Sequence, residues 1–395
     1  MGAPLDGIRV IDWTHVLAGP ACAYMLAQLG AEVIKVERPG RGDAMRHRGG
    51  SDRDAAAAGM STAYRTQGAG KQSIAIDLET REGHAVFSRL LERADVLVEN
   101  HRPATLQRLG LSETHTRAIN PRLIHCAMTG YGRGNAMSDA PAYDVNIQAI
   151  SGLMALTGTR TTGPLRTGAP VIDYATALAG ALGVLSALLA RHTSGAGRFV
   201  DVSMLETAFT LMGSTIADYR LTGIAPQPRG NTANSRSPAS GVFACAEGQI
   251  SLGVNEQAQF EALCRALSRP ELAADPRFTT AAARDENRGA LADVLVHVLQ
   301  SKSADHWEET LLAAGVPCAR LRSLPEALEL PAATHRAFAT RGPGGFAGLP
   351  FGADGPASDH PPPPLGADTR AVLRALSYSD ADIADLVARG AVGTT

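Results

Sequence analysis

Hydrophobic residues in the first third of the chain alternate between continuous runs and a helical spacing. Residues 7–13 and 32–37 are short apolar runs that predict buried strands. Residues 21–29, between these runs, carry apolar side chains at helical spacing and stop before Gly30. A strand–helix–strand unit of about 30 residues indicates two neighbouring parallel strands.

The same alternation continues to about residue 220. Further strands are predicted at residues 71–78, 94–100, 123–129 and 198–202. Further helices are predicted at residues 79–93, around residues 106–109 and at 206–217, whereas the Gly- and Ala-rich residues 57–69 are expected to be irregular. Strands that alternate with helices predict an α/β fold with an open, doubly wound, Rossmann-like sheet.

The most apolar predicted helix covers residues 174–191. It is almost uncharged and rich in Ala and Gly, so we expect a helix that is apolar on all sides and therefore buried. Asp173 stands at its start. Position alone favours Asp173 as the N-cap of the helix, because Asp is a preferred capping residue. The same carboxylate is also a candidate nucleophile or acid/base group.

Beyond residue 220 the pattern changes and indicates a second unit. Residues 221–240 are rich in Pro, Gly and Asn and are predicted to be a linker. Residues 241–325 form the second unit, and residues 326–364 a second linker that ends in a Gly- and Pro-rich stretch. Residues 365–395 form the C-terminal segment. The elements expected in this half are a hairpin around residues 247–248, helices at 257–267, 284–300, 306–314 and 368–389, and a strand at 316–321.

Composition and charge exclude several classes of function. The chain has 395 residues, 45% of them hydrophobic, and a net charge of −2 at pH 7, so neither a nucleic acid nor a membrane is an expected partner. The first residues lack the basic and apolar regions of a secretory signal, and the five cysteines form no CxxC pair. We therefore expect reduced thiols and a cytoplasmic location. The eleven histidines show no HxH or HExxH spacing, so no metal site is expected.

The loops after the first two strands distinguish between ligands. The first reads HVLAGP rather than GxGxxG, which disfavours NAD, and no GxSxG elbow of a serine hydrolase occurs. The second is Gly-rich and contains Arg38, Arg41, Arg46 and Arg48, and arginines in such a loop suit a phosphate or diphosphate. The polar residues expected to line one crevice at the strand ends are His15, Arg38, Asn100 and Tyr131.

Three segments together resemble the family III CoA-transferases, the CaiB/BaiF family. They are PLDGIRVIDWTHVLAGPACAYMLAQLGAEVIKVERPGRGD, the DVLVEN segment with RLGL, and the MTGYG loop. This superfamily includes formyl-CoA transferase, succinate–hydroxymethylglutarate CoA-transferase and α-methylacyl-CoA racemase. The resemblance covers nearly the whole chain and implies coenzyme A as substrate, with no prosthetic group. The residues that it places along the CoA groove are Val16, Ala18, Arg38, Lys71, Asn100 and Arg108, to which the strand-end position adds Tyr131.

The block GAPVIDYATALAGALGVLSALLARHTSGAGRFVDVSM resembles the catalytic segment of this family, and Asp173 matches its nucleophile. The resemblance implies an aspartyl anhydride and then an aspartyl-CoA thioester. An ordinary carboxyl pKa of about 4 leaves Asp173 ionised at neutral pH. A position at a helix N-terminus is expected to keep that pKa low.

The racemase branch of the family carries a His where this chain has Tyr143. A phenol with an ordinary pKa of about 10 is a poor base for proton abstraction, so the transferase branch is favoured. A 2-methylacyl-CoA racemase or epimerase and a non-catalytic CoA-binding protein stay as alternatives.

The resemblance also implies the architecture and assembly. It makes residues 1–220 the large CoA-binding domain and residues 241–325 a smaller α+β domain, with residues 365–395 returning to the large one. It further implies a homodimer of interlocked, ring-shaped subunits. Four arginines suggest a dicarboxylic donor such as succinyl-CoA, because they can receive a second carboxylate: Arg160, Arg166, Arg229 and Arg236.

Overall fold

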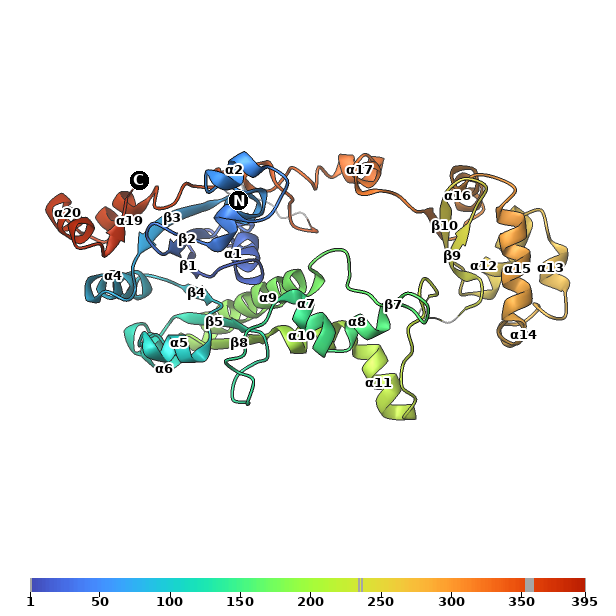
Figure 1. Cartoon of the computed structure of the whole chain (residues 1–395), viewed down its shortest axis with the longest axis horizontal. Helices are drawn as coiled ribbons and strands as arrows, with labels where there is room; N and C mark the ends of the chain where they lie inside the picture. The colour runs from blue at the N-terminus through green and yellow to red at the C-terminus, as the bar shows by residue number, and fades with distance from the viewer. Residues whose placement is uncertain (1, 234, 236, 352–358, 395) are drawn as a thin grey trace. The chain divides into compact units, whose positions relative to one another are not determined.

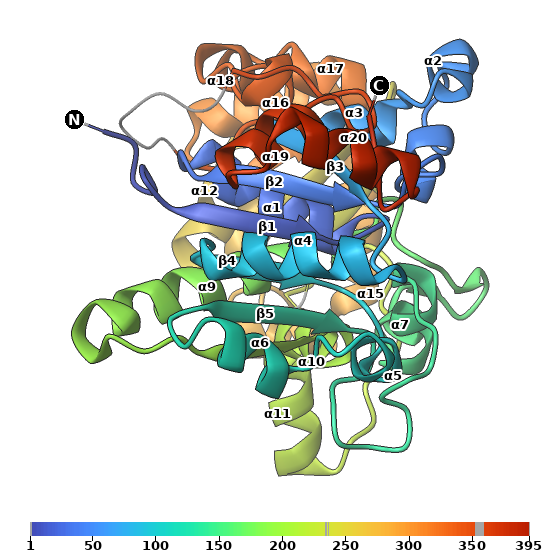
Figure 2. The same cartoon turned by 90° about the vertical axis from the view of Figure 1, so that its left-hand side faces the viewer.

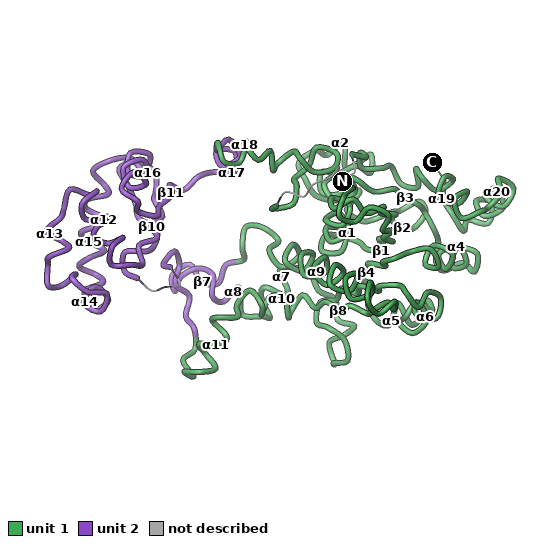
Figure 3. Tube along the Cα trace, turned by 180° about the vertical axis from the view of Figure 1, so that it is seen from behind, with its two compact units in different colours: residues 1–154, 166–225, 331–395 green, residues 155–165, 226–330 purple. Residues whose placement is uncertain are grey.

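A computed structural model describes residues 2–233, 235, 237–351 and 359–394. The chain forms two compact units (Figure 3). The first unit contains residues 1–154, 166–225 and 331–395, and the second contains residues 155–165 and 226–330. The C-terminal residues thus belong to the same unit as the N-terminal ones.

The first unit is built on a seven-stranded sheet with the order β12-β3-β2-β1-β4-β5-β8 (Figures 1 and 2). All neighbouring strands are parallel except the short C-terminal β12, which pairs antiparallel with β3. The predicted, mainly parallel sheet is confirmed. Its strands are β1 (Arg9–Trp13), β2 (Glu32–Glu37), β3 (Lys71–Ile76), β4 (Val96–Glu99), β5 (Ile124–Thr129), β8 (Phe199–Ser203) and β12 (Val392–Gly393).

Helices cover both faces of this sheet, as Figure 2 shows. Helices α1 (Ala18–Gln28) and α9 (Val171–Ser194) share a core with one set of strand side chains, which includes Val10. Helices α4 (Arg81–Glu92), α19 (Thr369–Ala375) and α20 (Asp380–Ala388) contribute to the core on the opposite face, with Ile11. Neighbouring strand residues therefore alternate between the two cores, as expected for a doubly wound sheet.

Several sequence-based boundaries are wrong because helix caps and breaks were missed. Residues 57–69 are irregular only in part: α3 occupies residues 62–68 behind the Ser61 cap, and α2, capped by Asp52, ends at Ala57. The predicted helix at residues 368–389 is interrupted near Ser377, whose φ of 70° is left-handed. The remaining helices described in this unit, with the 3-10 turns η1 and η2, are η1 (Ala44–His47), α2 (Arg53–Ala57), α3 (Thr62–Gly68), α5 (Pro103–Arg108), α6 (Glu113–Ile119), α7 (Asp144–Ile150), α10 (Met204–Leu211), α11 (Gly213–Thr222), α18 (Pro331–His335) and η2 (Pro343–Gly345).

Helix α9 is longer than predicted and is not buried on all sides. Its inner face packs against α1, β5, β8 and α10, and Ala177 and Val184 are fully buried there. Its outer face carries Leu182 and Leu189, which are 67% and 75% exposed. By length and composition α9 meets the criteria for a membrane span, which the core helix of a soluble protein also meets. The apolar composition was recognised correctly, but a sequence does not say what covers each face.

The second unit has its own three-stranded antiparallel sheet, with the order β11-β10-β9, and its own core around Phe260, Leu291 and Trp307. The predicted hairpin is confirmed: the Cys245 N–H donates to the carbonyl of Gly248, whose φ of 77° suits the turn. The strands of this unit are β6 (Gly158–Thr159), β7 (Gly163–Pro164), β9 (Ser240–Ala244), β10 (Gln249–Gly253) and β11 (Cys318–Arg320). Its helices are α12 (Gln257–Ala266), α13 (Glu271–Ala274), α14 (Ala281–Glu286), α15 (Arg288–Leu299), α16 (Ala304–Ala313) and α17 (Leu324–Leu328), and α8 (Leu153–Leu156) lies at the boundary of the two units.

Candidate active site

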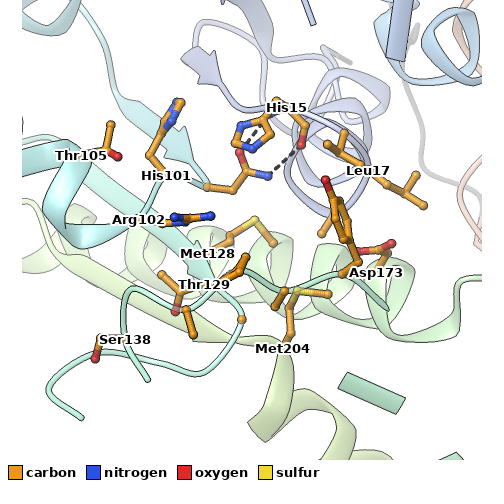
Figure 4. A pocket seen from close by; sticks show the side chains of 18 residues that line it. His15, Leu17, His101, Arg102, Thr105, Met128, Thr129, Ser138, Asp173 and Met204 are labelled. Atoms are coloured by element: carbon orange, nitrogen blue, oxygen red, sulfur yellow. Dashed lines mark hydrogen bonds between the residues drawn. The ribbon is translucent and has the colours of Figure 1, made fainter. Parts of the chain in front are cut away.

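A cavity of about 300 Å³ lies at the carboxyl ends of three neighbouring strands, β1, β4 and β5 (Figure 4). Ligands of open α/β sheets bind at this edge. Its walls come from the segments that follow these strands, from the loop at residues 138–143 and from the starts of α9 and α10. The lining residues are His15, Val16, Leu17, Ala18, Asn100, His101, Arg102, Thr105, Met128, Thr129, Gly130, Ser138, Ala140, Pro141, Ala142, Tyr143, Asp173 and Met204.

Five of the residues predicted for the site line this cavity: His15, Val16, Ala18, Asn100 and Asp173. The side chain of Asn100, which follows β4, forms hydrogen bonds with the segment that follows β1. Its side-chain Oδ1 accepts from the His15 N–H at 2.9 Å, and its Nδ2 donates to the His15 carbonyl at 2.8 Å. This pair of bonds satisfies both backbone groups of His15 and holds the two walls together.

The other four predicted residues do not line the cavity. Arg38 lies in the exposed loop after β2, and Tyr131 is partly buried and packs against the apolar cluster that contains Ile147. Arg108 is exposed and pairs with Glu79 at 3.4 Å. Lys71 is buried inside the sheet, where its Nζ lies 2.7 Å from Asp12 Oδ2.

The burial of Lys71 has a clear physical reason. Its ammonium donates to the Asp12 carboxylate and to the Pro20 carbonyl, so its charge is matched inside the protein. Arg46, from the loop considered for phosphate binding, is likewise buried and forms a two-point ion pair with Glu37. The sequence shows these cations but not that Asp12 on β1 and Glu37 on β2 lie against them.

Asp173 is not the N-cap of α9. The helix begins at Val171, and Pro170 occupies the cap position without a side-chain hydrogen bond. Asp173 is therefore the third helical residue, and its partly buried side chain lines the cavity. The capping bonds come from another helix instead, because Asp144 Oδ2 accepts from the N–H groups of Ile172 at 2.8 Å and Asp173 at 3.3 Å.

Asp144 is held in place by a small buried network. Gln148 Nε2 donates to Asp144 Oδ1 at 2.5 Å and to Thr167 Oγ1 at 3.0 Å. The Thr167 N–H in turn donates to Gln148 Oε1 at 3.0 Å. The network joins α7, the loop before α9 and the first turn of α9, and so it fixes where Asp173 stands. Asp144 follows Tyr143 directly in the chain, but its separation of 29 residues from Asp173 gave no sign that the two meet.

The pKa of Asp173 is raised to about 7, first by burial and then by the negative charge of Asp144. This corrects the expectation that the helix dipole keeps the pKa low. The helix N–H groups nearest to the carboxylate donate to Asp144, so their stabilisation goes to that acid. Near neutral pH, Asp173 is therefore divided between its protonated and ionised forms.

We expect Asp144→Asn to extend activity to lower pH. A carboxylate attacks only when it is ionised, so an activity that uses Asp173 as its nucleophile should have a kcat/KM that rises with pH through about 7. Removal of the Asp144 charge lowers the pKa of Asp173, so the ratio of activity at about pH 6 to that at about pH 8 should increase several-fold. Thr167→Val is the matched control: it loosens the same network but keeps the charge, and it should leave this ratio unchanged. An unshifted profile for Asp144→Asn would contradict the coupling of the two acids.

The cavity also contains two residues that the sequence did not predict for the site, His101 and Arg102. For His15, the sequence predicted a place in the crevice from its strand-end position but no contact with CoA. Burial lowers the pKa of His101 to about 3 and also lowers the pKa of His15, so both imidazoles are neutral near pH 7. The His101 ring stacks on Trp13 with centroids 3.9 Å apart, and the His15 ring lies 5.2 Å from His101. The position of His101 and Arg102 just after β4 is the sequence signal that could have identified them as site residues.

The chain resembles known CoA-transferases over most of its length. The family model described as CoA-transferase family III matches residues 5–369. The succinyl-CoA–D-citramalate CoA-transferase of Chloroflexus aurantiacus is 37% identical over 329 residues, which cover 83% of this chain and 81% of the relative. The human succinyl-CoA:glutarate CoA-transferase is 31% identical and is covered to 90%, with 98% of this chain. A crystal structure of a CAIB/BAIF family protein from Brucella suis matches with a TM-score of 0.83 and 29% identity, over 95% of this chain and 100% of that one.

Proposed function

This chain belongs to CoA-transferase family III, and from that premise we propose that it moves CoA between acids through covalent intermediates on Asp173. The observation that carries the proposal is the position of this carboxylate, which lines the cavity at the carboxyl edge of the sheet. An Asp nucleophile divides one difficult acyl exchange into easier steps. The pKa of about 7 makes Asp173 a stronger base than an ordinary carboxylate, and the ionised fraction still suffices for attack.

In the first half-reaction, a carboxylate oxygen of Asp173 attacks the thioester carbonyl of the donor. The carbon–sulfur bond breaks, CoA leaves as the thiolate, and a mixed anhydride remains on Asp173. The thiolate then attacks the side-chain carbonyl of Asp173. This forms an aspartyl-CoA thioester and releases the donor acid as a carboxylate.

The second half-reaction reverses these steps with the acceptor. Its carboxylate attacks the aspartyl thioester, which gives a new anhydride and free CoA thiolate. The thiolate attacks the acceptor's acyl carbonyl, so that the new acyl-CoA forms and the Asp173 carboxylate is restored. No net proton is taken up, which suits a cavity whose histidines are neutral.

For the thioester end of CoA we propose the cavity walls at Val16, Ala18 and Asn100. Arg38, in the exposed loop after β2, is the proposed partner of the diphosphate. Lys71 and Arg108 are left out of this proposal because their charges already have partners in Asp12 and Glu79.

We further propose a dicarboxylic donor such as succinyl-CoA. The relatives named above transfer CoA from succinyl-CoA, and the guanidinium of Arg102 on the cavity wall can pair with a second carboxylate. Arg160 and Arg229 belong to the second unit, Arg166 does not line the cavity, and Arg236 lies outside the described residues.

A panel of acyl-CoA donors and carboxylic acid acceptors, analysed by mass spectrometry, tests the function. We expect transfer only when a donor and an acceptor are both present, and a hydroxylamine- or borohydride-sensitive adduct that maps to Asp173. Loss of α-deuterium from a 2-methylacyl-CoA without any acceptor would instead identify a racemase. Binding of CoA without either reaction would identify a non-catalytic CoA-binding protein.

We also propose that the protein is a homodimer, interlocked as in the family resemblance, that covers the outer face of α9. Large exposed apolar areas on soluble proteins mark interaction sites, and this face carries Leu178, Leu182 and Leu189. Because interlocked subunits cannot separate while they stay folded, we expect Leu182→Glu to lower the melting temperature of the dimer, whereas Glu113→Gln, on α6, should not. A parent protein that is monomeric at micromolar concentration would contradict the proposal.

Five free cysteines, four of them buried, agree with the proposed cytoplasmic location.

A further inference from the structure

The wall of the cavity after β1 contains a strained residue. Val16 has a φ of 71°, in the left-handed region that β-branched residues almost never adopt. Val16 also lines the cavity. Strained residues of this kind persist only where their surroundings hold them, and they cluster at functional sites.

Two buried side chains, Lys35 and Asp43, hold the backbone at Val16 and two residues before it. The Val16 N–H donates to Asp43 Oδ1 at 3.2 Å. Lys35 Nζ donates to the Thr14 carbonyl at 3.0 Å, two residues earlier. Lys35 and Asp43 are themselves paired at 3.2 Å, and both side chains are 2% exposed. The ion pair therefore clamps the segment from Thr14 to Val16, and Asn100 holds His15 between them from the other wall.

The ammonium of Lys35 in this clamp stays charged at neutral pH. Burial works against the ammonium, but Asp12 and Asp43 outweigh it and raise the pKa of Lys35 to about 12. Lys35 lies 3.9 Å from Asp12, which is also paired with Lys71, so the cluster contains two cations and two anions. Buried ion pairs are often no more stabilising than apolar residues of the same shape, so stability alone does not explain this arrangement.

We propose that Lys35 and Asp43 are positioning residues that force Val16 into its left-handed conformation and so shape the cavity wall for the CoA thioester. Without the clamp, Val16 relaxes to negative φ, and the backbone from His15 to Ala18 turns away from the thioester. The two residues act through this backbone and do not touch the reacting atoms. The inference rests on the proposed transfer reaction at Asp173.

A double-mutant cycle between residues 35 and 16 tests the clamp. We expect Lys35→Met to raise KM for the acyl-CoA at least about tenfold, with a smaller change in kcat, because the wall is misplaced while Asp173 is not. Glycine adopts a φ near 70° without strain. Val16→Gly added to Lys35→Met should therefore reverse at least about a third of the increase in log KM. The measured coupling between the two sites is then clearly different from zero.

Arg191→Met is the matched control. Arg191 forms a partly buried ion pair with Asp95 at 2.8 Å, far along the chain from Val16. Its removal should lower the melting temperature, leave KM for the acyl-CoA unchanged and show no coupling to Val16→Gly. If Lys35→Met does not fold, the same cycle is measured with Asp43→Asn, which removes the ion pair at nearly constant volume.

The outcomes separate this inference from the proposed function. Additive effects of the Lys35 and Val16 substitutions, or an unchanged KM in a folded Lys35→Met variant, would overturn the clamp. Absence of transfer by the parent protein with every donor and acceptor would overturn the function instead. In that case the same double-mutant cycle is measured with the dissociation constant for CoA, obtained by calorimetry. Additive effects of the Lys35 and Val16 substitutions on this constant would still overturn the clamp.

Discussion

Asp173→Asn is expected to reduce CoA transfer by a factor of about 10⁴ or more, because it removes the carboxylate oxygen that forms both covalent intermediates in the proposed mechanism. The amide keeps the shape of the side chain but does not attack a thioester. The adduct at residue 173 should disappear in the same experiment. Normal turnover in the variant, or an adduct at another residue, would contradict the assignment of the nucleophile.

The same substitution is expected to leave the fold intact, in contrast to the loss of an N-cap. Asp173 does not cap α9, and burial and Asp144 both disfavour its ionised form. Because its folded-state pKa lies above the unfolded value, the folded protein binds the proton more tightly, and its stability decreases as pH rises from about 4 to about 7. Asp173→Asn removes this dependence, so its melting temperature at about pH 8 should equal or exceed that of the parent.

Glu113→Gln serves as the control for Asp173→Asn. Glu113 is also an acid in the first turn of a helix, α6, but its side chain is 41% exposed and pairs with Arg117. Its removal should cost less than about 1 kcal/mol and leave transfer unchanged. Equal losses of activity in the two variants would show a general effect of first-turn acids and not a role of Asp173.

Glu37→Gln is expected to have the largest effect on stability, a loss of about 3–5 kcal/mol in the free energy of unfolding. Arg46 donates to both oxygens of Glu37, at 2.8 and 2.6 Å, and the paired side chains are 2% and 1% exposed. Without the carboxylate charge, the guanidinium stays buried and uncompensated. Urea denaturation at neutral pH measures the difference.

The pH dependence of this pair has the opposite sign to that of Asp173. Burial alone would raise the pKa of Glu37, but hydrogen bonds from Arg46 and the nearby Lys35 lower it. The stabilisation is therefore present above the unfolded-state pKa and is lost as pH falls through the lower folded-state value. Glu79→Gln is the control: its pair with Arg108 is 53% and 60% exposed, so its loss should cost less than about 1 kcal/mol. A cost below about 1 kcal/mol for Glu37→Gln would contradict a large contribution of the buried pair to stability.

The amino-acid sequence predicted the strands most reliably, because their apolar runs are dictated by burial on both faces of a parallel sheet. β2 was predicted with its observed limits, and β1, β3, β4, β5 and β8 to within two residues at each end. Helix ends were less predictable. The break near Ser377 and the caps at Asp52 and Ser61 depend on single residues that also occur inside loops.

The candidate site was predictable in part. Asp173, Val16, Ala18 and Asn100 were expected in one groove, and they line one cavity. Lys71 was expected there as well, but it faces Asp12, which is 59 residues away in the chain and two strands away in the sheet. A charged residue looks the same in a sequence whether its partner is a substrate or a buried carboxylate.

The sequence by itself determined the alternation of strands and helices, the apolar character of α9 and the carboxylate at its start, because these follow from local spacing and residue type. Only the tertiary structure decided which face of α9 stays uncovered, that Asp144 and not Asp173 caps the helix, and that Asp173 titrates near neutral pH. Burial and charge pairing depend on residues brought together across the sheet. Such distances are set by packing, and spacing along the chain does not contain them.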